Sequence, residues 1–221
     1  MADDVRATGP HAGGPLLTAG APVVGAAGAM ILVHGRGGSA ADILSLAESL
    51  GRRDFAYLAP EAAGNTWYPH RFIEPTARNE PWLSSALAVV GGLVDRLVAQ
   101  GVPRSRIVLL GFSQGACLAT EAAARGGAGL GGVVGLSGGL IGAPGEPRPP
   151  AGGPYGGMPV ILGCSERDPH IPIGRVHETA AFFEANGASV TERVYPGAGH
   201  GVYEDEVELV RGLLAAVAAS G

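Results

Sequence analysis

Short apolar runs that alternate with helix-like segments constrain the fold of this chain more than any other feature. Each run is apolar at successive positions instead of alternating, which is typical of strands buried on both faces of a sheet. This arrangement predicts a mainly parallel central sheet with helices on both faces, the architecture of an α/β domain. The strand-like runs span 29–35, 55–60, 106–112, 131–139, 158–164 and 189–197, and the helix-like segments span 39–51, 80–101, 117–126, 173–187 and 203–220.

The two ends of the chain complete the predicted domain organisation. Residues 1–14 are polar and rich in glycine, so we expect them to form a flexible tail. A short edge strand fits within 15–22. Residues 15–221 are enough for one domain and show neither an internal repeat nor an inserted cap domain.

The charge balance excludes several classes of function. The net charge of −5 argues against a nucleic-acid partner. All 15 basic residues are arginine, which excludes a lysine Schiff base and the lysine of a P-loop. The first residues, MADDVRATGPHAGG, carry acids where a secretory signal has basic residues. No uninterrupted apolar run reaches the roughly 18 residues of a membrane span, so we expect a cytoplasmic protein without one.

The cysteines and histidines give no sign of a metal site. Cys117 and Cys164 both lie in apolar surroundings, which predicts buried free thiols instead of a disulfide. Neither these cysteines nor the six histidines show the spacing of metal ligands. The sequence therefore predicts no metal site.

The segment GFSQG places Ser113 between a predicted strand and a predicted helix. A nucleophile elbow needs this strand–turn–helix context, which lifts the serine oxygen above the edge of the sheet. Glycines at 111 and 115 suit so sharp a turn because a side chain would crowd the neighbouring strand and helix. The turn also directs the backbone N–H of Gln114 toward a developing negative charge.

A second segment of the same pattern, GLSGG at 135–139, makes Ser137 an alternative nucleophile. It also follows an apolar strand. The residues after it, GLIGAPGEPRPPAGGPYGG, are too rich in proline and glycine to form a helix. Ser137 therefore lacks the helix that would complete an oxyanion pocket, and Ser113 is the favoured candidate.

A serine nucleophile needs a base and an acid, which the elbow pattern places in the order serine, acid, histidine. His200 lies in the glycine-rich loop GAGHGV before the last helix, whereas His177 falls within an amphipathic helix. Asp168 follows the strand-like run MPVILGC and has Glu166 as its competitor. The Asp-Pro turn favours Asp168 as the residue that orients His200.

The segment HGRGG at 34–38 supplies a candidate for the second oxyanion donor. It follows the strand-like run AMILV, and a similar histidine-glycine motif provides a backbone N–H in other hydrolytic sites. Here the donor would be the N–H of Arg36, while His34 braces the loop. The side chain of Arg36 either meets an anionic group at the mouth of the site or is solvated.

These four motifs, HGRGG, GFSQGA, SERDPHIP and GAGHGV, together resemble the carboxylesterase, lysophospholipase and acyl-protein thioesterase family of α/β-hydrolases, over roughly residues 29–220. The resemblance implies a single-domain α/β-hydrolase fold and a Ser-His-Asp esterase without a cofactor. Members of the family commonly dimerise, so a homodimer is a further expectation. The residues it implies are Ser113, Asp168 and His200 in catalysis, with the backbone N–H groups of Arg36 and Gln114 in the oxyanion hole.

The chain departs from the family between the second strand-like run and the next helix. Relatives usually carry a tryptophan-aromatic pair followed by an aspartate, and here Pro69 follows Trp67 and Tyr68. Trp67, Tyr68 and Phe72 form either an apolar wall of the substrate pocket or a structural aromatic cluster. The Gly/Pro-rich stretch 139–157 is either a second rim or a long disordered connection.

The expected substrate is a small-molecule carboxylic ester. A thioester or a lysophospholipid would suit the same three side chains. A protein that binds such a ligand without catalysis is the alternative from another class, although such proteins have usually lost one of the catalytic residues.

Overall fold

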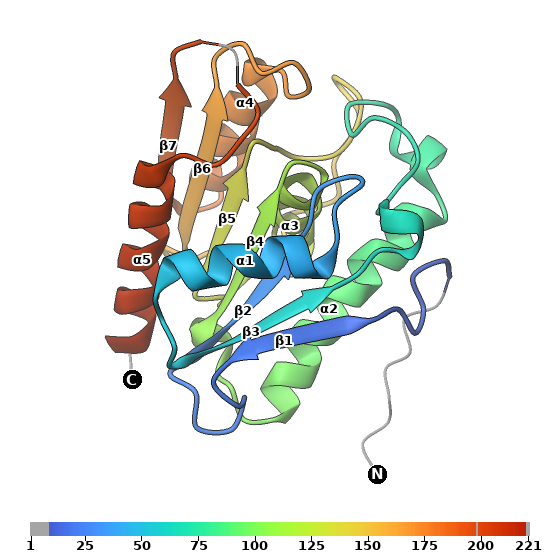
Figure 1. Cartoon of the computed structure of the whole chain (residues 1–221). Coiled ribbons are helices and arrows are strands. Elements are labelled where there is room, and N and C mark those ends of the chain that lie inside the picture. Colours follow the sequence, from blue (N-terminus) through green and yellow to red (C-terminus); the bar gives the residue numbers. More distant parts are fainter. Residues whose placement is uncertain (1–8, 198, 220–221) are drawn as a thin grey trace.

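The strands of the described residues form one seven-stranded sheet. The computed structural model describes residues 9–197 and 199–219 (Figure 1). The strand order is β1-β3-β2-β4-β5-β6-β7, and all neighbours are parallel except β1, which is antiparallel to β3. The predicted mainly parallel sheet is thus confirmed. The strands are β1 (Leu16–Gly20), β2 (Gly28–Val33), β3 (Phe55–Pro60), β4 (Ile107–Phe112), β5 (Gly132–Leu136), β6 (Pro159–Ser165) and β7 (Ser189–Tyr195).

Five α-helices of the described residues cover the two faces of this sheet, as the sequence predicted. Helices α1 and α5 pack on one face, and α2, α3 and α4 pack on the other (Figure 1). The molecule is therefore a single three-layered α/β domain. The helices are α1 (Ala40–Leu50), α2 (Trp82–Ala99), α3 (Gln114–Gly126), α4 (Ile173–Ala185) and α5 (Glu204–Ala219).

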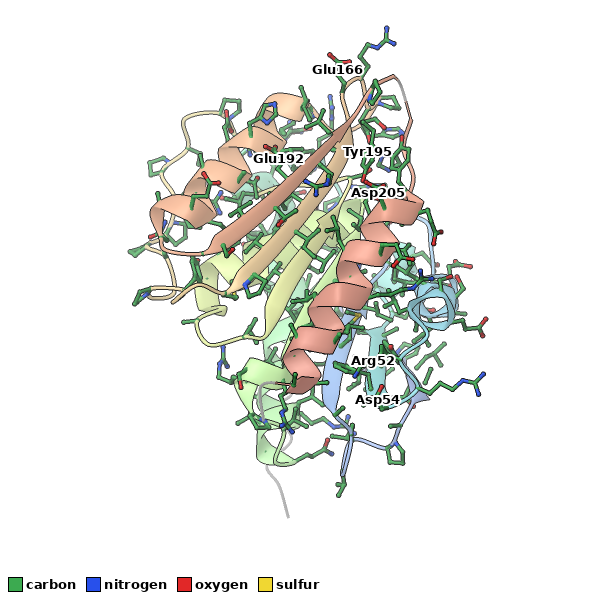
Figure 2. The ribbon with its side chains drawn as sticks, turned by 90° about the vertical axis from the view of Figure 1, so that its left-hand side faces the viewer. Arg52, Asp54, Glu166, Glu192, Tyr195 and Asp205 are labelled. Atoms are coloured by element: carbon green, nitrogen blue, oxygen red, sulfur yellow. The ribbon has the colours of Figure 1, made fainter. Side chains whose placement is uncertain are left out.

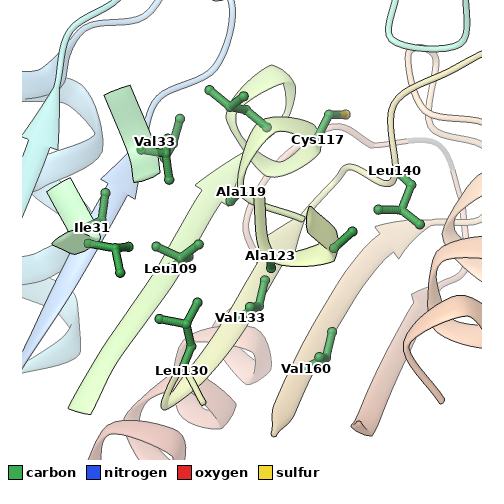
Figure 3. Packing of buried hydrophobic residues seen from close by; sticks show 14 of the residues in the cluster. Ile31, Val33, Leu109, Cys117, Ala119, Ala123, Leu130, Val133, Leu140 and Val160 are labelled. Atoms are coloured by element: carbon green, nitrogen blue, oxygen red, sulfur yellow. The ribbon is translucent and has the colours of Figure 1, made fainter. Parts of the chain in front are cut away.

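Alternate residues of the central strands build two separate cores. In β2, Ile31 and Val33 join the core under α2, α3 and α4, whereas Met30 and Leu32 join the core under α1 and α5. Figure 3 shows the first of these cores, with Leu109 and other strand residues packed beneath α3. Because both faces of the strands are buried, their sequences are apolar throughout instead of alternating.

A local signal in the sequence accounts for where α1 begins, whereas the start of α3 differs from the prediction. Ser39 caps α1 and forms a capping box with Asp42, as expected for a serine before a helical segment. Helix α3 begins at Gln114, three residues earlier than the predicted segment 117–126. The difference arises because α3 starts directly from the turn at Ser113 and includes Gly115. A glycine at such a place normally indicates a break in a helix.

Helix α2 is long and apolar enough, by length and composition alone, to be a candidate membrane span among the described residues. In the structure, the face that contains Leu83, Ala86, Val90 and Leu97 is buried in the core against the sheet. The core helix of a globular domain passes the same test of composition.

Part of the predicted flexible tail packs against the domain. Residues 1–8 lie outside the described residues, but His11 is only 2% exposed. Its Nε2–H donates to the carbonyl of Trp67 at 2.8 Å, and its Nδ1 accepts the N–H of Ala63 at 3.1 Å. Burial lowers the pKa of His11, in keeping with a neutral ring. The prediction is therefore corrected for residues 9–14, because a buried histidine holds them in place.

The stretch 139–157 is a connection without helix or strand, and it packs on α3 and α4. Tyr155 is buried and donates its hydroxyl to the carbonyl of Ala124 at 3.0 Å. Arg148 pairs with the buried carboxylate of Glu121 at 2.5 Å. This stretch borders a cavity of about 330 Å³ beside α3 and does not line the cavity above Ser113.

Candidate active site

Ser113 occupies a strained turn between β4 and α3. Its backbone has φ 55° and ψ −120°, a conformation that residues with side chains rarely adopt. A Cβ atom added at Gly111 would lie 2.1 Å from the carbonyl oxygen of Gly115, and one added at Gly115 would lie 2.1 Å from that of Val33. The turn therefore requires glycine on both sides of the serine, as the sequence predicted.

The structure brings Ser113, His200 and Asp168 together in one chain of hydrogen bonds. The Nε2 atom of His200 lies 2.8 Å from the Oγ atom of Ser113. The Nδ1 atom of the same ring lies 2.7 Å from the Oδ2 atom of Asp168. The three residues follow β4, β7 and β6, so the carboxyl ends of parallel strands bring them to one edge of the sheet.

The carboxylate of Asp168 is buried and well supplied with hydrogen-bond donors. Its side chain is fully buried, and Oδ1 accepts the backbone N–H groups of His170 at 2.8 Å and Ile171 at 3.0 Å. Burial alone would raise the pKa of Asp168, but the hydrogen bonds from His200 and from these two N–H groups outweigh it and lower the pKa. An ionised Asp168 holds a proton on Nδ1 of His200, which leaves Nε2 to accept the proton of Ser113.

The imidazole of His200 is held between two other rings. The Phe112 ring lies 5.0 Å away between centroids, and the His170 ring contacts it edge-on at 4.8 Å. Only 19% of the His200 side chain is exposed. The sequence did not indicate either contact with the imidazole, because both depend on how the end of β4 and the loops that carry His170 and His200 meet in the fold.

The backbone N–H groups predicted for an oxyanion hole lie at the ends of adjacent strands. Gln114 is the first residue of α3, so its N–H has no acceptor within the helix. Arg36 follows β2, which pairs with β4 up to Val33 and Gly111. Among the hydrogen bonds of residues 9–197 and 199–219, none uses the backbone N–H of Arg36 or Gln114. Both residues line the cavity that contains Ser113.

The side chain of Arg36 is exposed, as one of the two alternatives considered from the sequence expected, but it also makes contacts within the fold. Its guanidinium donates to three backbone carbonyls, those of Tyr68 at 2.8 Å, His70 at 2.9 Å and Pro69 at 3.1 Å. The residue thus clamps the segment beside the cavity. No sequence signal indicated this contact, since the three carbonyls lie more than 30 positions away.

The side chain of Gln114 holds the same segment from the other side. Its Oε1 accepts the N–H of Trp67 at 3.0 Å, and its Nε2 donates to the carbonyl of Tyr68 at 2.8 Å. The role predicted for Gln114 involved only its main chain. The side chain of the residue after Ser113 therefore also fixes the cavity wall.

His34 braces the loop before Arg36, as expected. The N–H of Ala62 donates to Nε2 of His34 at 3.1 Å, so the proton of the ring is on Nδ1, which donates to the carbonyl of Gly35 at 2.7 Å. Burial lowers the pKa of His34, which favours this neutral form.

The cavity above Ser113 has a volume of about 560 Å³ and is lined by two of the three aromatic residues singled out in the sequence. Tyr68 and Phe72 line it, together with His70, Arg71 and Cys117 among others. Trp67 does not: its ring is fully buried and its Nε1–H donates to the carbonyl of His34 at 2.9 Å. The assignment of Trp67 to the substrate pocket is therefore wrong, because the indole packs under the cavity wall.

The alternative residues considered from the sequence lie outside this hydrogen-bonded chain. Ser137 is 1% exposed, and its hydroxyl has a long contact of 3.5 Å with the carbonyl of Gly201. Glu166 points outward beyond the end of β6 (Figure 2). His177 pairs with Glu192 of β7 at 2.7 Å on the surface. Both cysteines are free and buried, as predicted.

A second pair of side chains joins the loops that carry Asp168 and His200. The hydroxyl of Tyr203 lies 2.6 Å from that of Ser165, the last residue of β6. The Tyr203 ring stacks on Tyr195, whose hydroxyl donates to Asp205 at 2.8 Å (Figure 2). A Cβ atom at position 199 would lie 2.7 Å from the Tyr203 hydroxyl, so Gly199 is needed for this contact. Sequence reasoning missed Tyr203, because nothing in its local pattern distinguishes it from a surface tyrosine.

Comparison with known proteins gives the context of this site. The model of the phospholipase/carboxylesterase family matches residues 21–218. The crystal structure of a phospholipase/carboxylesterase from Dyadobacter fermentans is 40% identical, with a TM-score of 0.87 over 95% of this chain and 100% of that one. A carboxylesterase from Bacillus cereus, 20% identical over 93% of this chain and 95% of that one with a TM-score of 0.72, shares the fold.

Curated relatives match over a shorter span. Acyl-protein thioesterase 1 of Gibberella zeae is 31% identical over 55% of this chain, and that of Saccharomyces cerevisiae is 30% identical over 52%. The chain spans about half the length of these relatives, 52% and 51% respectively. The family model covers nearly the whole α/β domain. The chain therefore belongs to the phospholipase/carboxylesterase family of esterase-type hydrolases.

Proposed function

We propose that the protein is a serine hydrolase that cleaves carboxylic esters of small molecules through an acyl-enzyme on Ser113. The observation that carries this proposal is the pair of contacts of 2.8 Å and 2.7 Å that join Ser113, His200 and Asp168. A serine hydroxyl is a weak nucleophile unless a base is within hydrogen-bond reach, and His200 meets that condition.

In the proposed mechanism, His200 takes the proton of Ser113 as the serine oxygen attacks the ester carbonyl. Ionised Asp168 stabilises the imidazolium that forms. The backbone N–H groups of Arg36 and Gln114 donate to the oxyanion of the tetrahedral intermediate. His200 then gives its proton to the leaving alcohol, and a water molecule repeats the sequence on the acyl-enzyme to release the acid.

An acyl-thioesterase activity is the second candidate, because the curated relatives that match half of the chain are acyl-protein thioesterases. The same three side chains would attack a thioester carbonyl. The leaving thiolate needs less help from a protonated His200 than an alkoxide does. The ratio of turnover on matched ester and thioester pairs, measured over several acyl lengths, decides between the two.

Labelling with a fluorophosphonate probe tests the proposal directly. An activated serine reacts with the probe, and we expect peptide mass spectrometry to find the adduct on Ser113 alone. Probe-labelled protein should lose hydrolysis of a short p-nitrophenyl ester in proportion to labelling. An unlabelled Ser113 in folded protein would indicate a hydrolase-like binding protein, and an adduct on Ser137 would move the chemistry to the other turn.

A further inference from the structure

The cavity above Ser113 carries a surplus of positive charge in a protein that is negative overall. The chain has a net charge of −5, yet two of the three permanently charged residues that line the cavity are arginines, Arg36 and Arg71. The third, Glu74, already forms an ion pair with Arg78. The carboxylate of Asp168 lies behind His200 with its side chain fully buried.

The two arginines differ in what their guanidinium groups can still bind. Arg36 uses its terminal nitrogens on the carbonyls of the segment 68–70, so it contributes charge but few free donors. Arg71 is exposed, and within the described part of the chain its guanidinium has one weak hydrogen bond, from Nη2 to the carbonyl of His170 at 3.5 Å. Among the residues that the structure describes, neither arginine has a carboxylate within ion-pair distance. Arg71 therefore keeps a planar fork of donors, the arrangement that binds carboxylate or phosphate through two hydrogen bonds.

The position of Arg71 connects this fork to the reaction. Its contact, His170, places an imidazole against the ring of His200, which is itself 2.8 Å from the Ser113 hydroxyl. Arg71 directly follows the segment 68–70 that Arg36 holds, and its side chain reaches across the cavity to the loop that carries Asp168. An anionic group bound there would belong to the same small molecule as the ester under attack.

We propose that Arg71 is a specificity-determining residue that selects esters bearing a carboxylate group. This inference rests on the proposed ester hydrolysis and names its substrate class. Arg36 adds to the positive potential around the site. The negative charge of Glu74 is offset by its ion pair with Arg78. A long, uncharged acyl chain would leave the Arg71 fork unused.

Matched ester pairs test this selectivity. The first pair, p-nitrophenyl hydrogen adipate and p-nitrophenyl hexanoate, differs by a terminal carboxylate on the acyl part. The second pair, the acetate esters of p-hydroxyphenylacetic acid and p-hydroxyphenylacetamide, carries the difference on the alcohol part. We expect kcat/KM to be about tenfold higher for the anionic member of at least one pair, because hydrogen bonds to a charged group carry roughly this factor. The pair that shows the preference identifies which part of the substrate bears the charge.

Variants separate recognition by Arg71 from a general effect of charge. Arg71→Gln should lower the ratio of anionic to neutral kcat/KM about tenfold, and Arg71→Lys should restore part of it. Arg193→Gln is the matched control, since it removes the same charge from an exposed residue of β7 and should leave the ratio unchanged. The wild-type ratio should also fall as salt is added.

Three results would overturn the inference while leaving ester hydrolysis in place. They are a wild-type ratio of about one or less on both pairs, an equal loss of both esters in Arg71→Gln, and an equal fall of the ratio in Arg193→Gln. Absence of turnover on every ester would instead overturn the proposed function, and the inference with it.

Discussion

The two G-x-S-x-G turns of this protein, at 111–115 and 135–139, lie side by side and have different surroundings. They follow the neighbouring parallel strands β4 and β5, and their first glycines, Gly111 and Gly135, are paired in the sheet. Both serines have positive φ angles, 55° for Ser113 and 53° for Ser137. Only Ser113 is followed by a helix and contacted by the ring of His200.

The difference indicates that the motif and its backbone strain do not by themselves bring a histidine to the serine hydroxyl. In both turns the serine N–H donates to a carbonyl of the next strand, that of Leu136 for Ser113 and that of Gly163 for Ser137, but after Ser137 the chain continues into the stretch 139–157 instead of a helix. Gly138 packs closely against Ala116 at the start of α3. The second turn therefore supports the first, whereas the first presents its hydroxyl to the cavity.

Exchanging the two serines for alanine is the strongest test of this comparison. We expect Ser113→Ala to lower kcat by about 10⁴- to 10⁶-fold, since loss of a nucleophile has effects of this size in serine hydrolases. Ser137→Ala should change kcat by less than about tenfold, because its hydroxyl makes a single long contact within the described residues. Hydrolysis of a short p-nitrophenyl ester measures both, and circular dichroism checks the fold. Similar losses in the two variants would contradict the comparison.

The acid partner of the first turn gives the next largest effect. Asp168→Asn should lower kcat by about 10³- to 10⁴-fold, because asparagine does not fix the proton of His200 on Nδ1. Glu166→Gln, two residues earlier and exposed, is the matched control and should retain near-normal turnover. Both are measured with the same ester. Full activity of Asp168→Asn would remove Asp168 from the mechanism.

Replacing Gly111 or Gly135 by alanine compares how much space each of the two turns leaves for a side chain. The Cβ of Gly111→Ala would meet the Gly115 carbonyl at 2.1 Å, so we expect the free energy of unfolding to fall by about 3–5 kcal/mol. The Cβ of Gly135→Ala would meet only side-chain methyl groups of Thr120 and Leu162, at 2.9 Å and 3.1 Å, which should cost about 1–2 kcal/mol. Urea denaturation measures both values. A larger loss in Gly135→Ala would show that the second turn is the more constrained.

The pH dependence of the free energy of unfolding tests the role of a buried glutamate, Glu206, that lies behind the second turn. Glu206 is fully buried, its Oε1 has no hydrogen-bond partner in the described part of the chain, and it packs against Gly163. Burial raises the pKa of Glu206 from its ordinary 4.5 to about 7. The folded protein thus holds a proton that the unfolded chain releases, so the free energy of unfolding should fall by about 2–3 kcal/mol as the pH rises from about 4.5 to 7.

Glu206→Gln should remove this component of the pH dependence, since glutamine stays neutral and its carbonyl still accepts the N–H of Tyr203. The control is Glu204→Gln, which removes an exposed carboxylate from the same helix. Urea denaturation at several pH values between 4 and 8 compares the variants with the wild type. The same slope in Glu206→Gln and in the wild type would show that Glu206 is ionised in the fold.

Most of the fold could be predicted because its signals are local. The apolar runs of β2, β4, β5 and β6 indicated buried parallel strands, and Ser39 indicated the start of α1. The contacts that were missed all join distant segments. The Arg36 clamp, the place of Trp67 under the cavity wall and the burial of His11 depend on side chains meeting across more than 30 positions, which no local pattern records.

The sequence by itself determined the order of strands and helices, and it placed a serine, an aspartate and a histidine after the ends of three strands. In a parallel sheet those ends share one edge, so their proximity follows from topology. Only the tertiary structure decided which side chains line the cavity and which carbonyls the guanidinium of Arg36 holds. The physical reason is that hydrogen bonds and packing between loops act over a few ångströms, and only the folded chain brings those loops within that range.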